Sequence, residues 1–381
     1  MNVPPPRRRF SPMNEPDRVD RLAGCLLGTA VGDALGLPRE NLSPRRAAKL
    51  FPGPVRHGLL PTPSGRRGMV SDDTEHTLLT ALALIEEPTD PDRFARALAR
   101  RLKWWLAGLP AGAGKATLKA CAKLSLGVPP DRSGVNSAGN GPVMRAAILG
   151  AFFHEDPERR RAFVEVSARL THTDPRAVAG AQTIAHAAAL AAGPALRQTP
   201  AATLAALIEE TTDPELRGVL IKTAAALRRG DDGATLASLL EWPRGGPSGF
   251  VLHTVPAIFW AWLAGEPAAT AADVRGGLER ALSLGGDADS TAAAVGGLAG
   301  TAGGTAAIPA GWLAGLWERP RGAAWMRRCA TQLGAAGRSP AAERAAALRA
   351  LRVPVGAVPA RNAAFLIVVL GHALRRLGPP W

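Results

Sequence analysis

The sequence predicts an all-α protein, and two observations support this. Apolar residues recur at helical spacing through most of the chain, as between Asp90 and Ala107, where Phe94, Leu98 and Leu102 fall on one side. No run of alternating apolar and polar residues is sustained, and no repeat of fixed period is visible. We therefore expect helices joined by short breaks at proline and glycine.

The first predicted helix runs from Arg18 to Leu35 and carries glycine on one side, at Gly24, Gly28 and Gly32. Glycine inside a helix costs about 1 kcal/mol relative to alanine, so its repeated use needs a compensating gain. Residues without side chains would let another backbone come close. We expect this side of the helix to pack tightly on a second one.

Helix starts and breaks place the remaining elements. Ser43 followed by Pro44, and Asp174 followed by Pro175, combine a capping residue with a first-turn proline. Residues 51–70 are rich in proline and glycine and are expected to form a long loop, which in compact domains is often functional. Helices are predicted at 44–50, 72–85, 90–107, 115–126, the second half of 133–145, in succession over 177–264, and at 309–333, 339–351 and 360–377.

The charge is strongly basic, with a formal net charge of +14 over 381 residues, and arginine contributes far more of it than lysine. Such an excess raises the possibility of a nucleic-acid-binding helical protein. The arginines are scattered, however, and no finger, basic zipper or RNA-binding sheet pattern occurs; the chain also lacks tyrosine. We expect a solvated basic surface that favours an anionic substrate and no nucleic-acid partner.

Cysteine and apolar content indicate a cytoplasmic protein. Cys25, Cys121 and Cys329 are odd in number and widely spaced, which argues against a disulfide framework and against structural zinc. The uncharged stretches 247–265 and 290–317 are interrupted by glycine, proline and hydroxyl residues, so they predict buried helices and no membrane association. Residues 1–16 lack the apolar region of a signal peptide and are expected to be a disordered tail.

Two acidic clusters stand at predicted helix starts. The first is Ser71-Asp72-Asp73-Thr74, and the second lies in residues 285–291. Aspartate and serine are also preferred N-caps, which would by itself explain one carboxylate at each start. Adjacent carboxylates repel each other unless a cation or hydrogen-bond donors intervene, and oxygen ligands suit Mg²⁺ or Mn²⁺. The clusters therefore predict one shared site for a hard cation.

Five segments occur in a fixed order: residues 24–40 (GCLLGTAVGDALGLPRE), 71–74 (SDDT), 139–145 (GNGPVMR), 171–174 (THTD) and 285–291 (GGDADST). In this ordered combination the chain resembles the ADP-ribosylglycohydrolase family, of the dinitrogenase-reductase-activating glycohydrolase type, over roughly residues 20–305. The resemblance implies a single compact orthogonal multi-helix domain over residues 17–320, with helices from residues 321–381 packed on it. We expect a monomer.

The resemblance also implies roles for individual residues. Glu40 and Asp289 are the implied catalytic residues. Two Mg²⁺ ions, or Mn²⁺, would be held by Ser71, Asp72, Asp73, Asp287, Asp289 and Ser290. The implied substrate-binding residues are Asn140, Gly141, Met144 and His172. By themselves, Glu40 would be a surface carboxylate, Asn140-Gly141 an ordinary turn and His172 a structural histidine.

The implied reaction is hydrolysis of the glycosidic bond at C1 of an ADP-ribose unit, carried by a modified protein or by a small molecule. A catalytically silent binder of ADP-ribose or a nucleotide on the same scaffold is the alternative. One departure from the family pattern stands out, since Gly112 occupies the turn where the family often has an aspartate. We expect weak activity on arginine-linked ADP-ribose, because no carboxylate there would pair with the leaving guanidinium.

Overall fold

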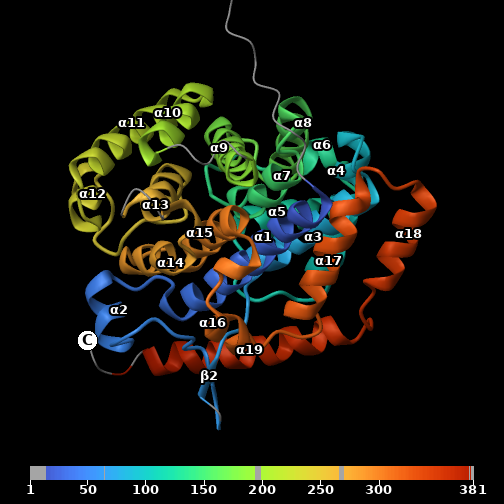
Figure 1. The fold of residues 1–381 in the computed structure, drawn as a ribbon. Coiled ribbons are helices and arrows are strands. Elements are labelled where there is room, and N and C mark those ends of the chain that lie inside the picture. Colours follow the sequence, from blue (N-terminus) through green and yellow to red (C-terminus); the bar gives the residue numbers. More distant parts are fainter. Residues whose placement is uncertain (1–13, 64, 194–198, 266–269, 377, 379–381) are drawn as a thin grey trace, which may run out of the picture.

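The structure is a computed structural model, and it describes residues 14–63, 65–193, 199–265, 270–376 and 378. Nearly all the regular structure is helical, so the predicted all-α class is confirmed (Figure 1). The tail expected at residues 1–16 falls mostly outside the described residues. The first helix, α1 (Glu15–Gly36), begins inside the expected tail, because Asn14 caps it by accepting a hydrogen bond from the amide of Asp17, so the prediction was wrong for Glu15 and Pro16.

Two helices, α1 and α15 (Ala288–Gly303), pack against each other at the centre of the fold (Figure 1). A Cβ added to Gly28 would lie 2.0 Å from the carbonyl oxygen of Gly296, so the two backbones touch. Gly24 and Gly32 meet α15 in the same way. The predicted close approach along this glycine face is confirmed.

The direction of this packing decides what lies at its end. Gly24 meets Gly300 while Gly32 meets Ala292, so the chain numbers rise along α1 and fall along α15. The two helices are therefore antiparallel. The C-terminal end of α1 consequently lies beside the first turn of α15, where Gly36 faces the carbonyl oxygen of Ala288.

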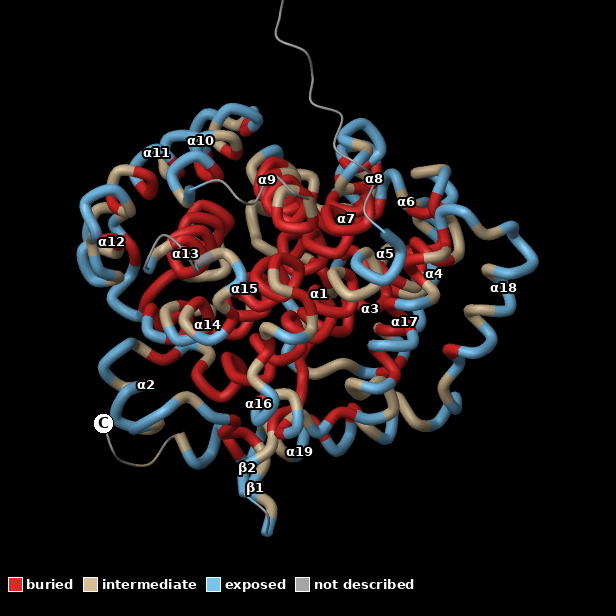
Figure 2. Tube along the Cα trace, viewed as in Figure 1, coloured by how far each residue is buried: buried red, intermediate tan, exposed pale blue. Residues whose placement is uncertain are grey.

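Further helices surround the central pair and bury it. Those with the most extensive contacts to α1 or α15 are α3 (Asp72–Glu86), α7 (Ala146–Phe152), α9 (Pro175–Ala192), α13 (Val251–Leu263), α14 (Val274–Ser283) and α17 (Ala323–Ala336). Figure 2 shows α1, α7, α13 and α15 buried over most of their length, while α14 and α17 are buried on one side. The expectation that residues 247–265 and 290–317 contain buried helices holds for α13 and α15.

An outer layer covers this group. It consists of α2 (Pro44–Leu50), α4 (Pro91–Ala107), α5 (Lys115–Ser125), α6 (Pro130–Ser133), α8 (Pro157–Arg169), α10 (Pro200–Glu210), α11 (Pro214–Arg229), α12 (Gly233–Leu239), α16 (Ala310–Gly315), α18 (Ala341–Ala350) and α19 (Ala357–Arg376). The predicted caps act as expected: Asp174 accepts a hydrogen bond from the amide of Arg176, and Ser43 accepts one from that of Arg46.

Two details differ from the sequence-based expectation. The segment expected to be an irregular loop contains an antiparallel hairpin, β1 (Leu60–Thr62) and β2 (Gly65–Arg67). Three-residue strands are too short to show a period-two pattern, so the sequence carried no signal for them. The helix expected at 309–333 is two helices, α16 and α17, separated by the non-helical residues 316–322, which include Pro320.

Candidate active site

Three helix ends meet where α1 and α15 finish their contact, and Asp33 joins two of them. Its carboxylate oxygens accept hydrogen bonds from the amide of Ser71 at 3.0 and 2.9 Å. Thr74 adds its amide at 3.1 Å and its hydroxyl at 2.5 Å. A residue of α1 thereby caps the N-terminus of α3 and holds the cluster of residues 71–73 in place.

Asp33 is fully buried, and burial raises its pKa to about 6, although the hydrogen bonds from Thr74 and Ser71 act in the opposite direction. Asp33 is not among the site residues predicted from the sequence. Its contacts show that it positions α3, which only the packing of α1 against α3 could reveal.

The two acidic clusters predicted from the sequence lie together. The hydroxyl of Ser290 donates a hydrogen bond to Oδ2 of Asp73 at 3.2 Å, although the two residues are 217 positions apart. Ser71 donates to the same oxygen, also at 3.2 Å. The start of α3 and the start of α15 therefore form one surface of oxygen atoms.

Glu40 joins this group through a backbone pairing. Its neighbour Asn41 donates its amide to the carbonyl of Gly286 at 2.7 Å, and the amide of Gly286 donates to Leu42 at 2.9 Å. Gly286 has a φ of +67°, and a Cβ there would lie 2.1 Å from the carbonyl oxygen of Pro247. Glycine is therefore required for the pairing that brings Glu40 to the start of α15.

Four carboxylates at this site, those of Glu40, Asp72, Asp73 and Asp289, have raised pKa values. Burial is the largest cause for Asp72, Asp73 and Asp289, whose pKa values lie well above the usual range, and neighbouring carboxylates add to it. The pKa of the half-buried Glu40 is raised by burial and then by Asp287, while Arg376 opposes the shift. Buried negative charges at such close range need protons or cations to compensate them.

The chemistry of these residues fits a hard cation. All candidate ligands are carboxylate or hydroxyl oxygens, which Mg²⁺ and Mn²⁺ prefer. Oδ1 of Asp73 is buried and has no hydrogen-bond partner. Within the described part of the chain, no three His, Cys, Asp or Glu side chains already converge as a metal-binding group. The donor types and the unpartnered Asp73 oxygen support the fit, while the four aspartates of the predicted set do not converge into a ready-made cluster within the described residues.

The residues predicted for substrate binding border the same site. The Asn140 amide donates to Oδ2 of Asp287 at 2.6 Å and to the hydroxyl of Thr254 at 3.1 Å, which ties their loop to the start of α15. A Cβ on Gly141 would lie 2.6 Å from Cε1 of His172, so the missing side chain makes room for the imidazole. Asn140, Gly141 and His172 therefore form one wall.

Two further observations describe this wall. Burial and the nearby Arg145 lower the pKa of His172 to about 3, so its imidazole is neutral at physiological pH. Arg145 is fully buried and donates to the carbonyl of Gly141 at 3.1 Å and to the hydroxyl of Thr171 at 2.7 Å. Met144 is buried, and its carbonyl accepts a hydrogen bond from Thr77 of α3 at 2.9 Å.

The contribution of α19 to the site was not predicted from the sequence. Arg376 donates to the carbonyl of Glu40 at 2.6 Å, and Arg361 donates to that of Val70, the residue before the first acidic cluster. Arg361 also pairs with Glu318 at 2.8 Å and with Glu75 at 3.3 Å. No local pattern could indicate these contacts, since they join residues 286 or more positions apart for every partner except Glu318.

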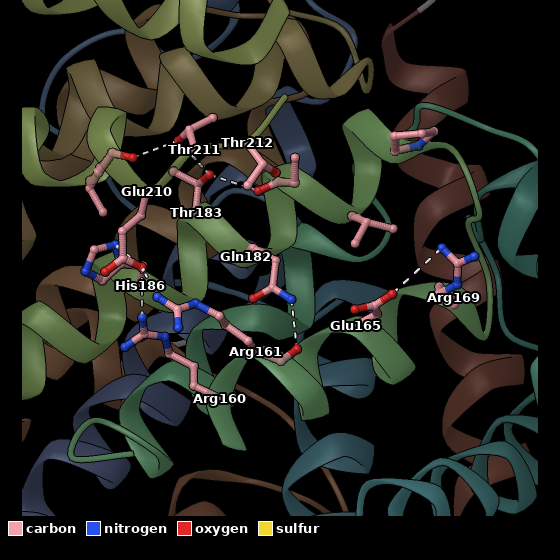
Figure 3. Close-up of a pocket in the computed structure, with 14 residues that line it drawn as sticks. Arg160, Arg161, Glu165, Arg169, Gln182, Thr183, His186, Glu210, Thr211 and Thr212 are labelled. Carbon is pink, nitrogen blue, oxygen red and sulfur yellow. Dashed lines mark hydrogen bonds and ion pairs between the residues drawn. The ribbon is translucent and has the colours of Figure 1, made fainter. Parts of the chain in front are cut away.

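A separate cavity of about 350 Å³ lies between α8, α9 and α10 (Figure 3). None of the predicted site residues lines it. Arg160 and Arg161 both pair with Oε2 of Glu210, at 3.3 and 3.1 Å, and His186 approaches the same oxygen at 3.5 Å. Its cationic groups are thus already paired within the protein, and the chemistry of the carboxylate site is absent from it.

Comparison with known proteins agrees with this geometry. A solved structure titled "ADP-ribosylglycohydrolase-related protein complex" has a TM-score of 0.63 and 29 % identity, with 84 % of this chain and 98 % of that chain covered. An uncharacterized protein of Archaeoglobus fulgidus is 34 % identical over 311 residues, which is 79 % of this chain and 92 % of that protein.

An uncharacterized Escherichia coli protein, YegU, is 32 % identical over 185 residues, which is 45 % of this chain and 53 % of that protein. The sequence model of the ADP-ribosylglycohydrolase family matches residues 14–346, a range that contains every predicted site residue and ends before α19. The chain therefore belongs to the ADP-ribosylglycohydrolase family.

Proposed function

We propose that the protein is a metal-dependent hydrolase that cleaves the glycosidic bond at C1 of an ADP-ribose unit. The observation that carries this proposal is the buried group of carboxylates at the starts of α3 and α15, with an unpartnered oxygen on Asp73. Family membership supports the same reaction class. The substrate would be an ADP-ribosylated protein or a small molecule that contains ADP-ribose.

The two acidic clusters would hold two Mg²⁺ or Mn²⁺ ions. When bound, these cations would supply the positive charge that orients ribose hydroxyls and a water molecule. The proposed ligands are Ser71, Asp72, Asp73, Asp287, Asp289 and Ser290. Asp33 is not a proposed ligand. It would orient the ligands of the first cluster, because it accepts hydrogen bonds from Ser71 and Thr74.

Glu40 would take the proton of the attacking water. Its pKa is raised above the usual glutamate value by burial and by Asp287, and a carboxylate with a raised pKa is a better base near neutral pH. Positive charge develops on the ribose as the bond to the leaving group breaks, and the surrounding carboxylates stabilise that charge. Neutral His172 and Asn140 would contact the ribose from the opposite wall.

The proposal is tested with a panel of substrates: arginine-linked and serine-linked ADP-ribosyl peptides and small ADP-ribose derivatives. Release of ADP-ribose is followed by chromatography with Mg²⁺, with Mn²⁺ and with EDTA. We expect turnover of at least one substrate with the metal and its loss with EDTA. Binding of ADP-ribose by calorimetry without any turnover would assign the protein to silent binders, and neither binding nor turnover would contradict the whole assignment.

A further inference from the structure

The outermost long helix, α19, has its polar and apolar sides reversed relative to an ordinary surface helix. Its protein-facing side carries Arg361, Asn362, His372 and Arg376, which bind the body of the protein through hydrogen bonds and ion pairs. A helix at the surface of a soluble protein normally buries its apolar side and exposes its polar side. Phe365 also packs inward, together with the partly buried Val368 and Val369.

The outward side is apolar and unusually exposed. Four large residues at helical spacing form it, and their exposed fractions are 45 % for Leu366, 71 % for Ile367, 54 % for Leu370 and 69 % for Leu374. Of the described helices, α19 is the one long and apolar enough to cross a membrane by length and composition. Only 17 % of its most apolar 18-residue stretch is buried in the protein, so most of this stretch is not covered. Figure 2 shows exposed and intermediate residues along it, in contrast to α15.

Arginines gather at the C-terminal end of this apolar side. Arg375 is exposed, and its charge, together with that of Arg56, adds to burial in lowering the pKa of the exposed Arg66. Arg46 likewise adds to burial in lowering the pKa of Arg376. Arg46 donates a hydrogen bond to the carbonyl of Arg376, which brings α2 against the end of α19. The side chain of Arg376 faces the protein, so the exposed arginines beside the apolar side are Arg375 of α19 and Arg56 and Arg66 of the 51–70 segment. A large apolar strip bordered by clustered cationic charge is typical of helices that lie in a membrane interface.

We propose that α19 docks the protein on an anionic membrane surface, with Leu366, Ile367, Leu370 and Leu374 in the acyl boundary and the neighbouring arginines on lipid phosphates. The helix lies on the membrane and does not cross it, because its inner side is tied to Pro38, Glu40 and Glu318. A second copy of the chain is the alternative occupant, but it carries the same formal net charge of +14, which opposes self-association and favours an anionic surface. Charge complementarity therefore favours lipid, in contrast to the absence of a membrane partner expected from the sequence.

The test is co-sedimentation of the full chain with vesicles of phosphatidylcholine alone and of phosphatidylcholine mixed with phosphatidylglycerol. We expect binding to the mixed vesicles, weakened by salt. Ile367→Ser and Leu370→Ser should each lower the partition coefficient about tenfold, and Arg375→Glu should lower it about fivefold or more. Ile221→Ser on α11, where the parent residue is 51 % exposed, and Arg217→Glu on the same helix are the matched controls and should bind as the unmodified chain does.

Circular dichroism and light scattering accompany each measurement. All substituted residues are exposed, so the variants should keep the helical spectrum of the unmodified protein. The proposal is overturned if the unmodified chain ignores anionic vesicles at low salt, or if the α19 variants bind as well as the controls. A dimer that dissociates in Ile367→Ser, without vesicle binding, would assign this surface to a second copy instead.

Discussion

Two long apolar helices, α15 and α19, differ in how far they are buried in this fold. Beyond its first turn α15 carries no charged residue, and it is buried along nearly its whole length. α19 is rich in leucine, isoleucine and valine, yet its outward side lies open. The difference follows from side-chain size, because the glycines and alanines of α15 let the backbone of α1 touch it, whereas the bulky residues of α19 keep any helix at a distance.

An apolar composition therefore indicates that a helix has a surface to bury, but it does not determine what buries it. Small residues select another helix at backbone contact, and this contact brings the acidic clusters of the site together. In α19 the large apolar residues lie on one side and the arginines on the other. The helix is therefore attached to the protein through ion pairs and hydrogen bonds, and its apolar side stays exposed.

The largest effect is expected from Gly28→Val, which tests the contact of α1 with α15. A Cβ at this position would lie 2.0 Å from the carbonyl oxygen of Gly296, and backbone cannot yield as a flexible side chain does. We expect a loss of at least about 4 kcal/mol in the free energy of unfolding, measured by urea titration. Gly218→Ala in α11, with open space around it, is the control and should be neutral or stabilising. Similar stability of the two variants would refute the close contact.

Asp289→Ala separates the chemical task of α15 from its packing task. Removal of a proposed cation ligand should lower turnover at least about a hundredfold. Burial and neighbouring carboxylates already disfavour the ionised form of Asp289, so the free energy of unfolding at neutral pH should stay the same or rise. Kinetics and urea titration check both parts. The exposed Asp131 provides a control, Asp131→Ala, and retained turnover in Asp289→Ala would remove the residue from the site.

Arg361→Met tests whether charged bonds hold α19 in place. The substitution leaves the buried carboxylates of Glu318 and Glu75 without their cation, which costs about 3–5 kcal/mol of stability. Arg375→Met removes an exposed arginine of the same helix and should have little effect. The double variant Arg361→Met with Glu318→Gln should recover part of the loss, since one stranded charge is gone. Equal melting of both single variants would show that α19 is held by other means.

The smallest effect concerns the turn next to α19, where the Asn362 side chain donates to the carbonyl of Gly108 at 2.7 Å. Gly112 has a φ of +83° and no atom near its missing Cβ, so an aspartate fits in space, at a modest backbone cost. We expect Gly112→Asp to raise the rate on arginine-linked relative to serine-linked ADP-ribosyl peptides several-fold. Gly112→Asn is the uncharged control. An unchanged ratio would mean that this turn does not determine the preferred linkage.

Most helix positions could be predicted from the sequence because the responsible interactions are local. A cap such as Asp174 and the first-turn Pro175 act within one turn of the chain, and α2 begins and ends at the predicted residues. The glycine face of α1 also indicated close packing before the partner was known. The cation site could also be proposed from the sequence, since adjacent carboxylates at two helix starts suit few purposes other than capping and cation binding. Their roles in catalysis remain predictions.

The sequence by itself determined the helical class, the helix starts and the types of side chain available for chemistry, all of which depend on neighbours along the chain. Only the tertiary structure decided that Asp33 caps α3 and that Ser290 donates a hydrogen bond to Asp73. It also decided that Arg361 and Arg376 of α19 bind backbone carbonyls next to the site. It also decided that the apolar side of α19 faces outward. The physical reason is that these contacts join distant residues, and their geometry depends on how closely whole helices can approach.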